Sequence, residues 1–333
     1  MEIRVPDDFH LHVRQGAVLS ACAPYSASWC ARALVMPNTL PPVSTPESAV
    51  SYKREIAGAV SSFEPLLSFK ILPSMTPDAV CSLKAAGCIA GKLYPAGATT
   101  NAEDGVSSVA QISGVLKAME DAGLVLCVHG EQPEDPILTR EISYIPVIER
   151  LAADYPKLRI VFEHLSTKEA VDAVLGMPET VAATLTPHHM SMTLDDMIGG
   201  NMNPYHFCKP VVKQPRDRDA IAGAAVSGNG KFFLGTDSAP HPKNSKLNGS
   251  ASPGIFCAPV AMPVVAGVFE SLGALDALED FASRFGAEFY GLPLNAGTLI
   301  LEKDSWTVPA EYGEFVPMMA GKTLEWRVIR RSE

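Results

Sequence analysis

The sequence predicts an α/β fold in which eight parallel strands alternate with helices and close into a TIM-type (β/α)8 barrel. Short apolar runs recur along the chain, each followed by polar or glycine-rich residues and then by a segment with helical periodicity. The length of 333 residues is close to that of one such barrel with modest extensions. The main rival is a doubly wound open sheet, but its dinucleotide-binding turn, G-x-G-x-x-G after the first strand, is absent.

Eight segments have the length and apolar content of buried strands. In chain order these strands are predicted at 3–5 running on toward 12, 31–36, 68–72, 88–93, 124–128, 158–162, 180–185 and 231–235. Between them, the segment 107–120 places Val109, Ile112 and Leu116 on one helix face. Further helices are predicted at 144–153, at 167–175 with Ser166 or Thr167 as the cap, and at 214–225.

The C-terminal part of the chain, roughly 288–333, is expected to be irregular. We expect it to pack back on the barrel instead of forming a second domain. The whole of 1–333 is therefore predicted to be a single (β/α)8 barrel domain with a C-terminal extension packed on the barrel.

The composition, with 47% hydrophobic and 19% charged residues, is that of an ordinary globular protein. A formal net charge of −10 at pH 7 argues against nucleic acid or an anionic membrane as the main partner, although a pocket can still be locally positive. The N-terminus lacks a signal-peptide apolar region and no run of about 18 apolar residues occurs, so we expect a cytoplasmic protein. The seven cysteines include no C-x-x-C pair and are expected to be buried, reduced thiols.

Two histidines, His10 and His12, occupy alternate positions at the end of the first predicted strand. Alternate residues of a strand project to the same face, so both imidazoles can reach one metal ion. The alternative for this pair alone is two histidines on a polar strand face.

Further metal-binding side chains follow the ends of other predicted strands. These are Lys92, His129, His164 and Asp237. In a barrel the carboxyl ends of all strands meet at one rim, where barrel enzymes carry out their chemistry. Imidazole and carboxylate ligands suit zinc or a similar transition metal. The sequence therefore predicts a metal site at this rim.

Lys92 is the exception in this set, because a lysine ammonium has no lone pair for a metal. One alternative is a buried lysine in a salt bridge with Asp237 or Glu163. The other is a lysine carboxylated by CO2, whose carbamate oxygens can bridge two cations. The sequence leaves both alternatives open.

Six segments in a fixed order carry a resemblance to a known family. They are His10-Leu-His12-Val-Arg14, Met36-Pro-Asn38, Lys92-Leu-Tyr-Pro, Val128-His-Gly, Phe162-Glu-His164 and Gly235-Thr-Asp-Ser-Ala-Pro-His241. Together they resemble the amidohydrolase superfamily, and more closely the short, bacterial-type class of dihydroorotase. The resemblance covers about residues 4–260, with similar stretches as far as 293.

The resemblance implies a metal-dependent amidohydrolase with two Zn²⁺ per chain, bridged by carboxylated Lys92. The implied ligand sets are His10, His12, Lys92 and Asp237 for one ion, and Lys92, His129 and His164 for the other. The implied substrate contacts are Arg14, Asn38 and His241 on an α-carboxylate, Thr99 and Thr100 on a mobile lid, and Lys209 and Pro253 through their backbone. At Lys209 and Pro253 the sequence departs from the small or apolar residues that the family often has.

The reaction implied by the resemblance is the reversible cyclisation of N-carbamoyl-L-aspartate to L-dihydroorotate, in de novo pyrimidine biosynthesis. Asp237 would be the catalytic residue that moves a proton between the water and the ring nitrogen. Another cyclic-amide hydrolase, a hydantoinase or allantoinase, is the first alternative, and the carboxylate-binding residues argue against it. A non-catalytic barrel relative is the second, and the complete ligand set argues against that. The expected partner is a small molecule, and a homodimer is compatible with the sequence.

The lid is predicted at 95–104, where small residues precede the two threonines. The alternative is a capping turn in which Thr100 or Asn101 begins the helix near Val109.

Three other polar residues lie close to the predicted ligands. His188 and His189 are interpreted either as groups that support the metal ligands from behind or as polar rim residues. Glu163 precedes His164 on a strand, so we expect its side chain to point away from the site.

Overall fold

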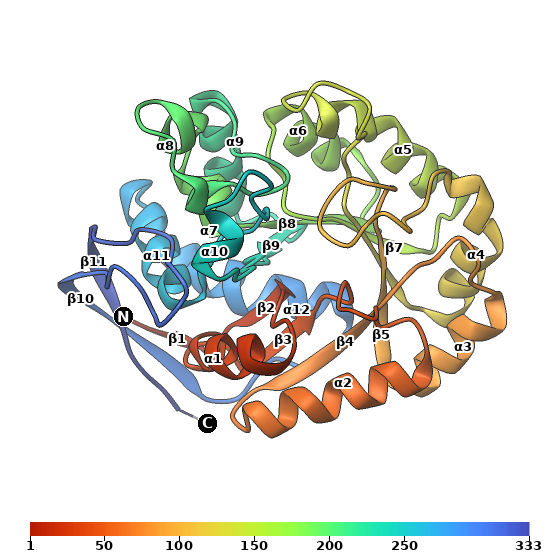
Figure 1. The fold of residues 1–333 in the computed structure, drawn as a ribbon, viewed down its shortest axis with the longest axis horizontal. Helices are drawn as coiled ribbons and strands as arrows, with labels where there is room; N and C mark the ends of the chain where they lie inside the picture. The colour runs from red at the N-terminus through yellow and green to blue at the C-terminus, as the bar shows by residue number, and fades with distance from the viewer. Residues whose placement is uncertain (333) are drawn as a thin grey trace.

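The computed structural model describes residues 1–332 and contains the predicted barrel (Figure 1). Eight parallel strands follow one another in chain order. They are β2 (Asp7–Leu11), β3 (Arg32–Val35), β4 (Glu64–Lys70), β5 (Cys88–Leu93), β6 (Val125–Val128), β7 (Arg159–Phe162), β8 (Val181–Leu185) and β9 (Phe232–Leu234). Just beyond β9, Ser238 forms a parallel bridge with Leu11 of β2, which brings the last and first strands together. The predicted fold class is confirmed.

Helices lie around the barrel between its strands (Figure 1). They are α1 (Gly16–Ala27), α2 (Pro46–Ala59), α3 (Pro77–Ala85), α4 (Ser113–Ala122), α5 (Arg140–Asp154), α6 (Lys168–Gly176), α7 (Pro187–Ser191), α8 (Leu194–Ile198), α9 (Pro215–Val226), α10 (Lys243–Lys246), α11 (Ala261–Ser271) and α12 (Phe285–Tyr290). Threonine caps several of them: Thr45, Thr76 and Thr167 each accept a hydrogen bond from the backbone N–H three residues on. The cap predicted at Thr167 is confirmed.

The N-terminal segment differs from its prediction. The strand expected to run from residue 3 toward 12 is in fact two strands, β1 (Glu2–Arg4) and β2, with Pro6 between them. Proline has no N–H to continue a ladder. Only β2 joins the barrel, whereas β1 pairs antiparallel with β10 (Thr298–Thr307), which in turn pairs with β11 (Thr323–Arg331).

The expectation of an irregular C-terminal region is wrong, because β10 and β11 fill much of it. The pairing of β10 with β1 joins residues about 300 apart, and local periodicity does not reveal such a contact. Trp326 of β11 donates from Nε1 to Glu270 of α11 at 3.0 Å, so this sheet packs on a barrel helix. That the chain forms a single domain stays a prediction.

At the amino ends of the strands, the barrel interior is filled by apolar side chains and closed by α12. Phe9 of β2 stacks on Tyr290 of α12 with ring centroids 4.7 Å apart. Gly286 allows this approach, since a Cβ there would lie 2.3 Å from the Phe9 ring. Arg159, the first residue of β7, donates to Phe289 O at 2.7 Å, which places α12 at the amino ends of the strands. The opposite end of the barrel is thus left for the site.

Within residues 1–332, no helix combines the length and apolar character needed to cross a membrane. All seven cysteines are unpaired, and six of them are buried as expected. Cys81 on α3 is the exception, because it lies on the exposed face of that helix.

Candidate active site

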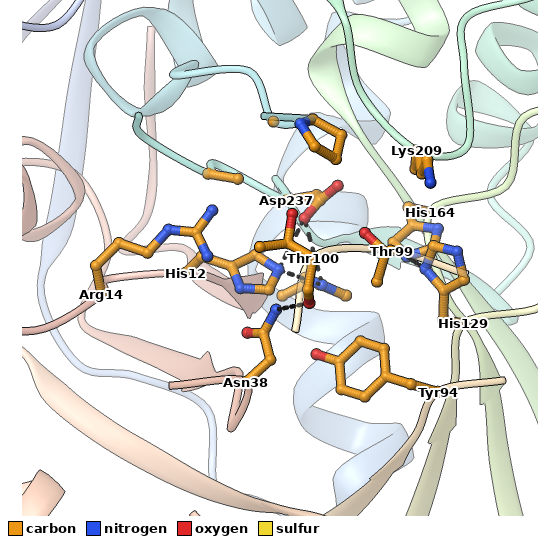
Figure 2. A pocket seen from close by; sticks show the side chains of 14 residues that line it. His12, Arg14, Asn38, Tyr94, Thr99, Thr100, His129, His164, Lys209 and Asp237 are labelled. Atoms are coloured by element: carbon orange, nitrogen blue, oxygen red, sulfur yellow. Dashed lines mark hydrogen bonds and ion pairs between the residues drawn. The ribbon is translucent and has the colours of Figure 1, made fainter. Parts of the chain in front are cut away.

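A narrow pocket lies at the carboxyl ends of the barrel strands (Figure 2). It is lined by His10, His12, Arg14, Asn38, Tyr94, Thr99, Thr100, His129, His164, Lys209, Asp237, Ala239, Pro253 and Gly254. The structure therefore brings eleven of the thirteen residues predicted for the site to one pocket wall. The other two, Lys92 and His241, each lie beside a residue of that wall, Tyr94 and Arg14 respectively.

His10, His12 and Asp237 form one group of donor atoms. Nε2 of His12 lies 3.1 Å from Oδ1 of Asp237, and Nε2 of His10 lies 3.4 Å from the same oxygen. Burial lowers the pKa of His12 to about 4, so its imidazole is in the neutral form that binds metals. Burial alone would raise the pKa of Asp237, but the hydrogen bond with His12 and the electrostatic effect of the neighbouring imidazoles outweigh it, so this pKa lies well below its usual value.

His129 and His164 form a second group beside the first. Nδ1 of His129 lies 3.2 Å from Nε2 of His164, and the His164 ring centroid is 5.0 Å from that of His10. Burial lowers the pKa of both His129 and His164. Two imidazole nitrogens at this distance can share one proton in a hydrogen bond, or both can bind one cation.

Lys92 is completely buried near the end of β5. Its Nζ has no hydrogen-bond partner among the described residues, so the salt bridge considered with Asp237 or Glu163 is not formed. Nζ lies 5.3 Å from the ring centroid of Tyr94, and burial lowers the pKa of the amine. Carboxylation of Lys92 is the alternative that remains, and it stays a prediction.

The backbone bends sharply at three of the residues that line the pocket. Arg14, His164 and Asp237 have φ values of 61°, 43° and 47°, in the left-handed region. Such a conformation costs a non-glycine residue about 1–3 kcal/mol and is concentrated at functional sites. Gly235 precedes the last bend, and a Cβ there would lie 3.0 Å from Cβ of His10. The strand ends are therefore shaped to direct side chains into the pocket.

One end of the pocket carries groups suited to an anion. Nη2 of Arg14 lies 2.9 Å from Nε2 of His241. The same Nε2 lies 3.1 Å from Pro253 O, so His241 links Arg14 to the segment that carries Pro253. Burial lowers the pKa of His241 to about 3. His241 thus positions Arg14 from behind. Figure 2 shows Lys209 at the opposite end, on the side of His129.

Thr99 and Thr100 reach the pocket from the loop 95–104, which follows β5. Nδ2 of Asn38 donates to Thr100 O at 3.3 Å, and Nδ2 of Asn101 donates to Asn38 O at 2.9 Å. The loop is thus fastened to the chain segment after β3.

A second fastening comes from Lys70, the last residue of β4. Its buried Nζ donates to Asn101 O at 2.6 Å and pairs with Asp104 of the same loop. The capping alternative for Thr100 and Asn101 is wrong, because the following helical turn at 109–112 is capped by Ser108.

Comparison with known proteins identifies the family. The model of the amidohydrolase family matches residues 70–312. A dihydroorotase from Neisseria gonorrhoeae is 47% identical over 335 residues, which cover 97% of this chain and 97% of the relative. The chain belongs to the dihydroorotases of the amidohydrolase family. A crystal structure of dihydroorotase from Saccharomyces cerevisiae in complex with 5-fluoroorotic acid has a TM-score of 0.93 and 34% identity, covering 100% of this chain and 99% of that one. The dihydroorotase of Campylobacter jejuni has a TM-score of 0.92 and 37% identity, covering 99% and 97%.

As a member of the dihydroorotase family, the chain is a metal-dependent cyclic amide hydrolase, and its side chains fit a metal centre. The donor set is nitrogen and carboxylate oxygen, which suits zinc. The orphaned Nζ of Lys92 and Nδ1 of His164 are buried polar atoms without partners among the described residues. Buried polar atoms are rarely left unpaired, so both atoms fit a site that binds a further group.

Two carboxylates hold the dihydroorotase histidines from behind. Glu163 accepts from Nδ1 of His10 at 2.8 Å, so the expectation that it points outward is wrong. The reason is that Val161 faces the barrel interior and strand alternation turns Glu163 inward as well, while His164 beyond the strand enters through its left-handed backbone. Glu131, 2.9 Å from Nε2 of His129, was missed, although a carboxylate two residues after a ligand is a usable signal.

His188 and His189 are buried on α7, and neither lines the pocket. Neither makes a hydrogen bond to a predicted metal ligand within residues 1–332, so their support of those ligands stays a prediction. Tyr94 was also missed: it lines the pocket, and its buried hydroxyl has no partner in the described chain.

Proposed function

We propose that this chain catalyses the reversible closure of N-carbamoyl-L-aspartate to L-dihydroorotate, with release of water, in pyrimidine biosynthesis. The observation that carries the proposal is a single pocket with a full set of metal-binding side chains and, at one end, Arg14 with Asn38 beside it. A substrate of the hydantoin or allantoin type has no α-carboxylate that needs this arginine.

We further propose that the pocket holds two Zn²⁺ ions bridged by carboxylated Lys92. Their ligands would be His10, His12, Lys92 and Asp237 for one, and Lys92, His129 and His164 for the other. The unpartnered Nζ and the close neutral imidazoles support this assignment. When bound, such ions supply Lewis acidity and lower the pKa of a bound water to roughly 7.

The chain itself supplies the proton transfer and the binding. The lowered pKa keeps the Asp237 carboxylate ionised, so in hydrolysis it accepts the proton of the attacking water and passes it to the leaving ring nitrogen. In ring closure the same carboxylate moves the proton in the opposite direction. Arg14 offers two parallel N–H donors to the α-carboxylate, and His241 fixes the arginine plane.

The loop 95–104 would close over the bound substrate. Thr99 and Thr100 lie at its inner face and offer two hydroxyls to the ligand, while the backbone of Lys209 and Pro253 completes the wall. Closure would exclude water from the pocket. We also propose a cytoplasmic enzyme whose partner is this small molecule, with a homodimer as the expected assembly if the chain is not a monomer.

A spectrophotometric assay of dihydroorotate hydrolysis, run beside hydantoin and allantoin on the same zinc-loaded protein, tests the proposed activity. Turnover of dihydroorotate far above the other two substrates is expected. Hydrolysis of hydantoin or allantoin without dihydroorotate turnover would overturn the proposal, and a protein inactive on all three would support a non-catalytic role.

Arg14→Lys tests the carboxylate site. We expect KM for dihydroorotate to rise at least about tenfold while kcat changes less, because a bidentate contact becomes a point charge. Arg216→Lys, on the exposed face of α9 and paired only with acidic side chains, is the matched control and should leave KM unchanged. An Arg14→Lys enzyme with wild-type KM would contradict the role.

A further inference from the structure

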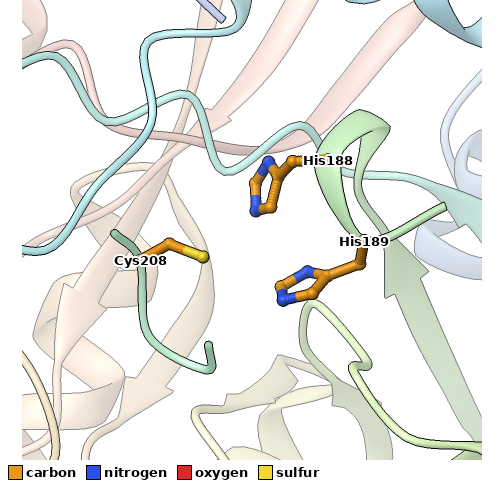
Figure 3. Close-up of side chains that lie close together, drawn as sticks. All are labelled: His188, His189 and Cys208. Atoms are coloured by element: carbon orange, nitrogen blue, oxygen red, sulfur yellow. The ribbon is translucent and has the colours of Figure 1, made fainter. Parts of the chain in front are cut away.

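Three metal-binding side chains gather at a second place, outside the pocket (Figure 3). They are His188 and His189 of α7 and Cys208, which follows the turn at 204–206. Their donor atoms all lie within 4.8 Å of one another, and the side chains are 0%, 2% and 1% exposed. Figure 3 shows both imidazoles and the thiol facing a common space.

His188 gives the independent sign that something is missing from this cluster. Both of its ring nitrogens are buried, and neither has a hydrogen-bond partner within residues 1–332. One nitrogen of a neutral imidazole carries a lone pair and the other a proton, so the residue has unused capacity for both a ligand and a second partner. A buried imidazole that pairs with nothing is uncommon in a folded protein.

The ring of His189 is held in one tautomer by its two hydrogen bonds. Its Nε2 lies 3.0 Å from Pro210 O, and since a carbonyl only accepts, Nε2 carries the proton. Nδ1 therefore carries the lone pair and now accepts from Thr186 Oγ1 at 2.9 Å. A ligating histidine commonly donates its other N–H to a backbone carbonyl, which fixes the ring and its tautomer.

Cys208 supplies the third donor and the negative charge. Its Sγ lies 3.1 Å from Pro210 O, so the thiol proton now points at the carbonyl. Binding of a divalent cation replaces that S–H bond by a sulfur–metal bond and releases the proton to solvent. No oxidant or reductant is needed for this exchange.

We propose that His188, His189 and Cys208 form a binding site for a thiophilic divalent cation of the zinc type, separate from the catalytic pocket. Imidazole and thiolate are both ligand types that zinc binds, and water could complete the four ligands of a tetrahedral ion. This donor set is softer than that of the pocket, which has no sulfur ligand, so the two sites differ in the metals they prefer. Neither the proposed reaction nor its metal centre is needed for this inference.

Occupancy would have a structural consequence. The ion would tie α7, which follows β8, to the segment that carries Lys209 on the pocket wall. The ion is therefore expected to hold that wall in place, and its loss should lower the melting temperature.

Titration of the metal-depleted full chain with Co²⁺ alone tests the site. A thiolate bound to Co²⁺ gives an intense near-ultraviolet charge-transfer absorption, which ligands of nitrogen and oxygen do not give. We expect this absorption in the wild-type chain and its loss, with one fewer cobalt bound per chain, in Cys208→Ser. Cys81→Ser, which removes an exposed thiol, should keep both the absorption and the stoichiometry. His12→Asn, in the pocket, should keep the absorption while losing pocket metal.

His188→Gln keeps the thiol, and it tests the proposed site even if Cys208→Ser does not fold. Its far-ultraviolet circular dichroism should match the wild type, while its affinity for the absorbing cobalt falls at least tenfold. A wild-type chain that shows no thiolate absorption at excess Co²⁺ would overturn the proposal. So would an absorption that survives Cys208→Ser or an affinity that is unchanged in His188→Gln.

Discussion

His129 and Thr99 line the same pocket, yet the chain holds them in different ways. His129 directly follows a barrel strand, is 2% exposed, and is braced by Glu131 at 2.9 Å. Thr99 belongs to a loop whose hydrogen bonds to the rest of the pocket include those of Asn38, Asn101 and Lys70. A side chain at a strand end is fixed before any substrate arrives, whereas a loop held by a few hydrogen bonds can open. We therefore expect substitutions of the proposed metal ligands to lower metal content as well as activity, and substitutions of the loop threonines to lower activity alone.

Lys92→Ala should have the largest effect, because it removes the side chain proposed to bridge both ions. We expect kcat/KM to fall at least about a thousandfold, near 4 kcal/mol of barrier, and the metal content to fall with it. Short carboxylic acids should restore part of the activity. Lys231→Ala, which removes another buried lysine far from the pocket, is the control and should keep its metal. An active, metal-loaded enzyme with an unmodified lysine in its electron density would refute the bridge.

Asp237→Asn should keep the fold and abolish turnover. The substitution preserves volume but removes both the proton acceptor and one anionic ligand. Activity within about tenfold of wild type, under 1.4 kcal/mol, would contradict the proton-transfer role. Asp172→Asn, at an exposed position of α6, is the matched control and should be silent in the same assay.

Thr99→Ala combined with Thr100→Ala should lower kcat about a hundredfold with little change in melting temperature or metal content. A lid acts on the closed, substrate-bound state and contributes little to folding. The control is Thr76→Ala at a true helix cap, which should lose about 1 kcal/mol of stability and keep its kcat. A double variant that melts lower but turns over normally would show that the loop is only structural.

Lys70→Met should give the smallest loss of activity, and it tests whether the loop and the strand-end residues act independently. It removes the bond to Asn101 and the ion pair with Asp104 but no pocket residue. We expect kcat to fall about three- to tenfold, under 1.4 kcal/mol, with metal content unchanged. Lys117→Met, on the exposed face of α4, should change nothing. Loss of metal in Lys70→Met would mean that the loop and the metal centre are not independent.

The barrel and the positions of the candidate metal ligands could be predicted because both follow from local pattern. Lys92 and His129 stand at the ends of apolar runs, and the ends of parallel strands converge whatever the details of the helices. Glu163 could not be placed, because the direction of its side chain depends on where β7 ends and on the left-handed φ of His164. The Lys70 contact with the loop joins residues 34 positions apart, so no local sequence pattern predicts it.

The pairing of β1 with β10 imposes a delay on how the chain can fold. Met1 donates to Leu301 O at 2.7 Å, and Ile3 lies opposite Leu299. On a ribosome that adds roughly 5–20 residues per second, the strand that Ile3 must join is completed only about 15–60 s after Ile3 itself has been made. During that time β1 has no partner, so the first strand to be synthesised is among the last to be paired.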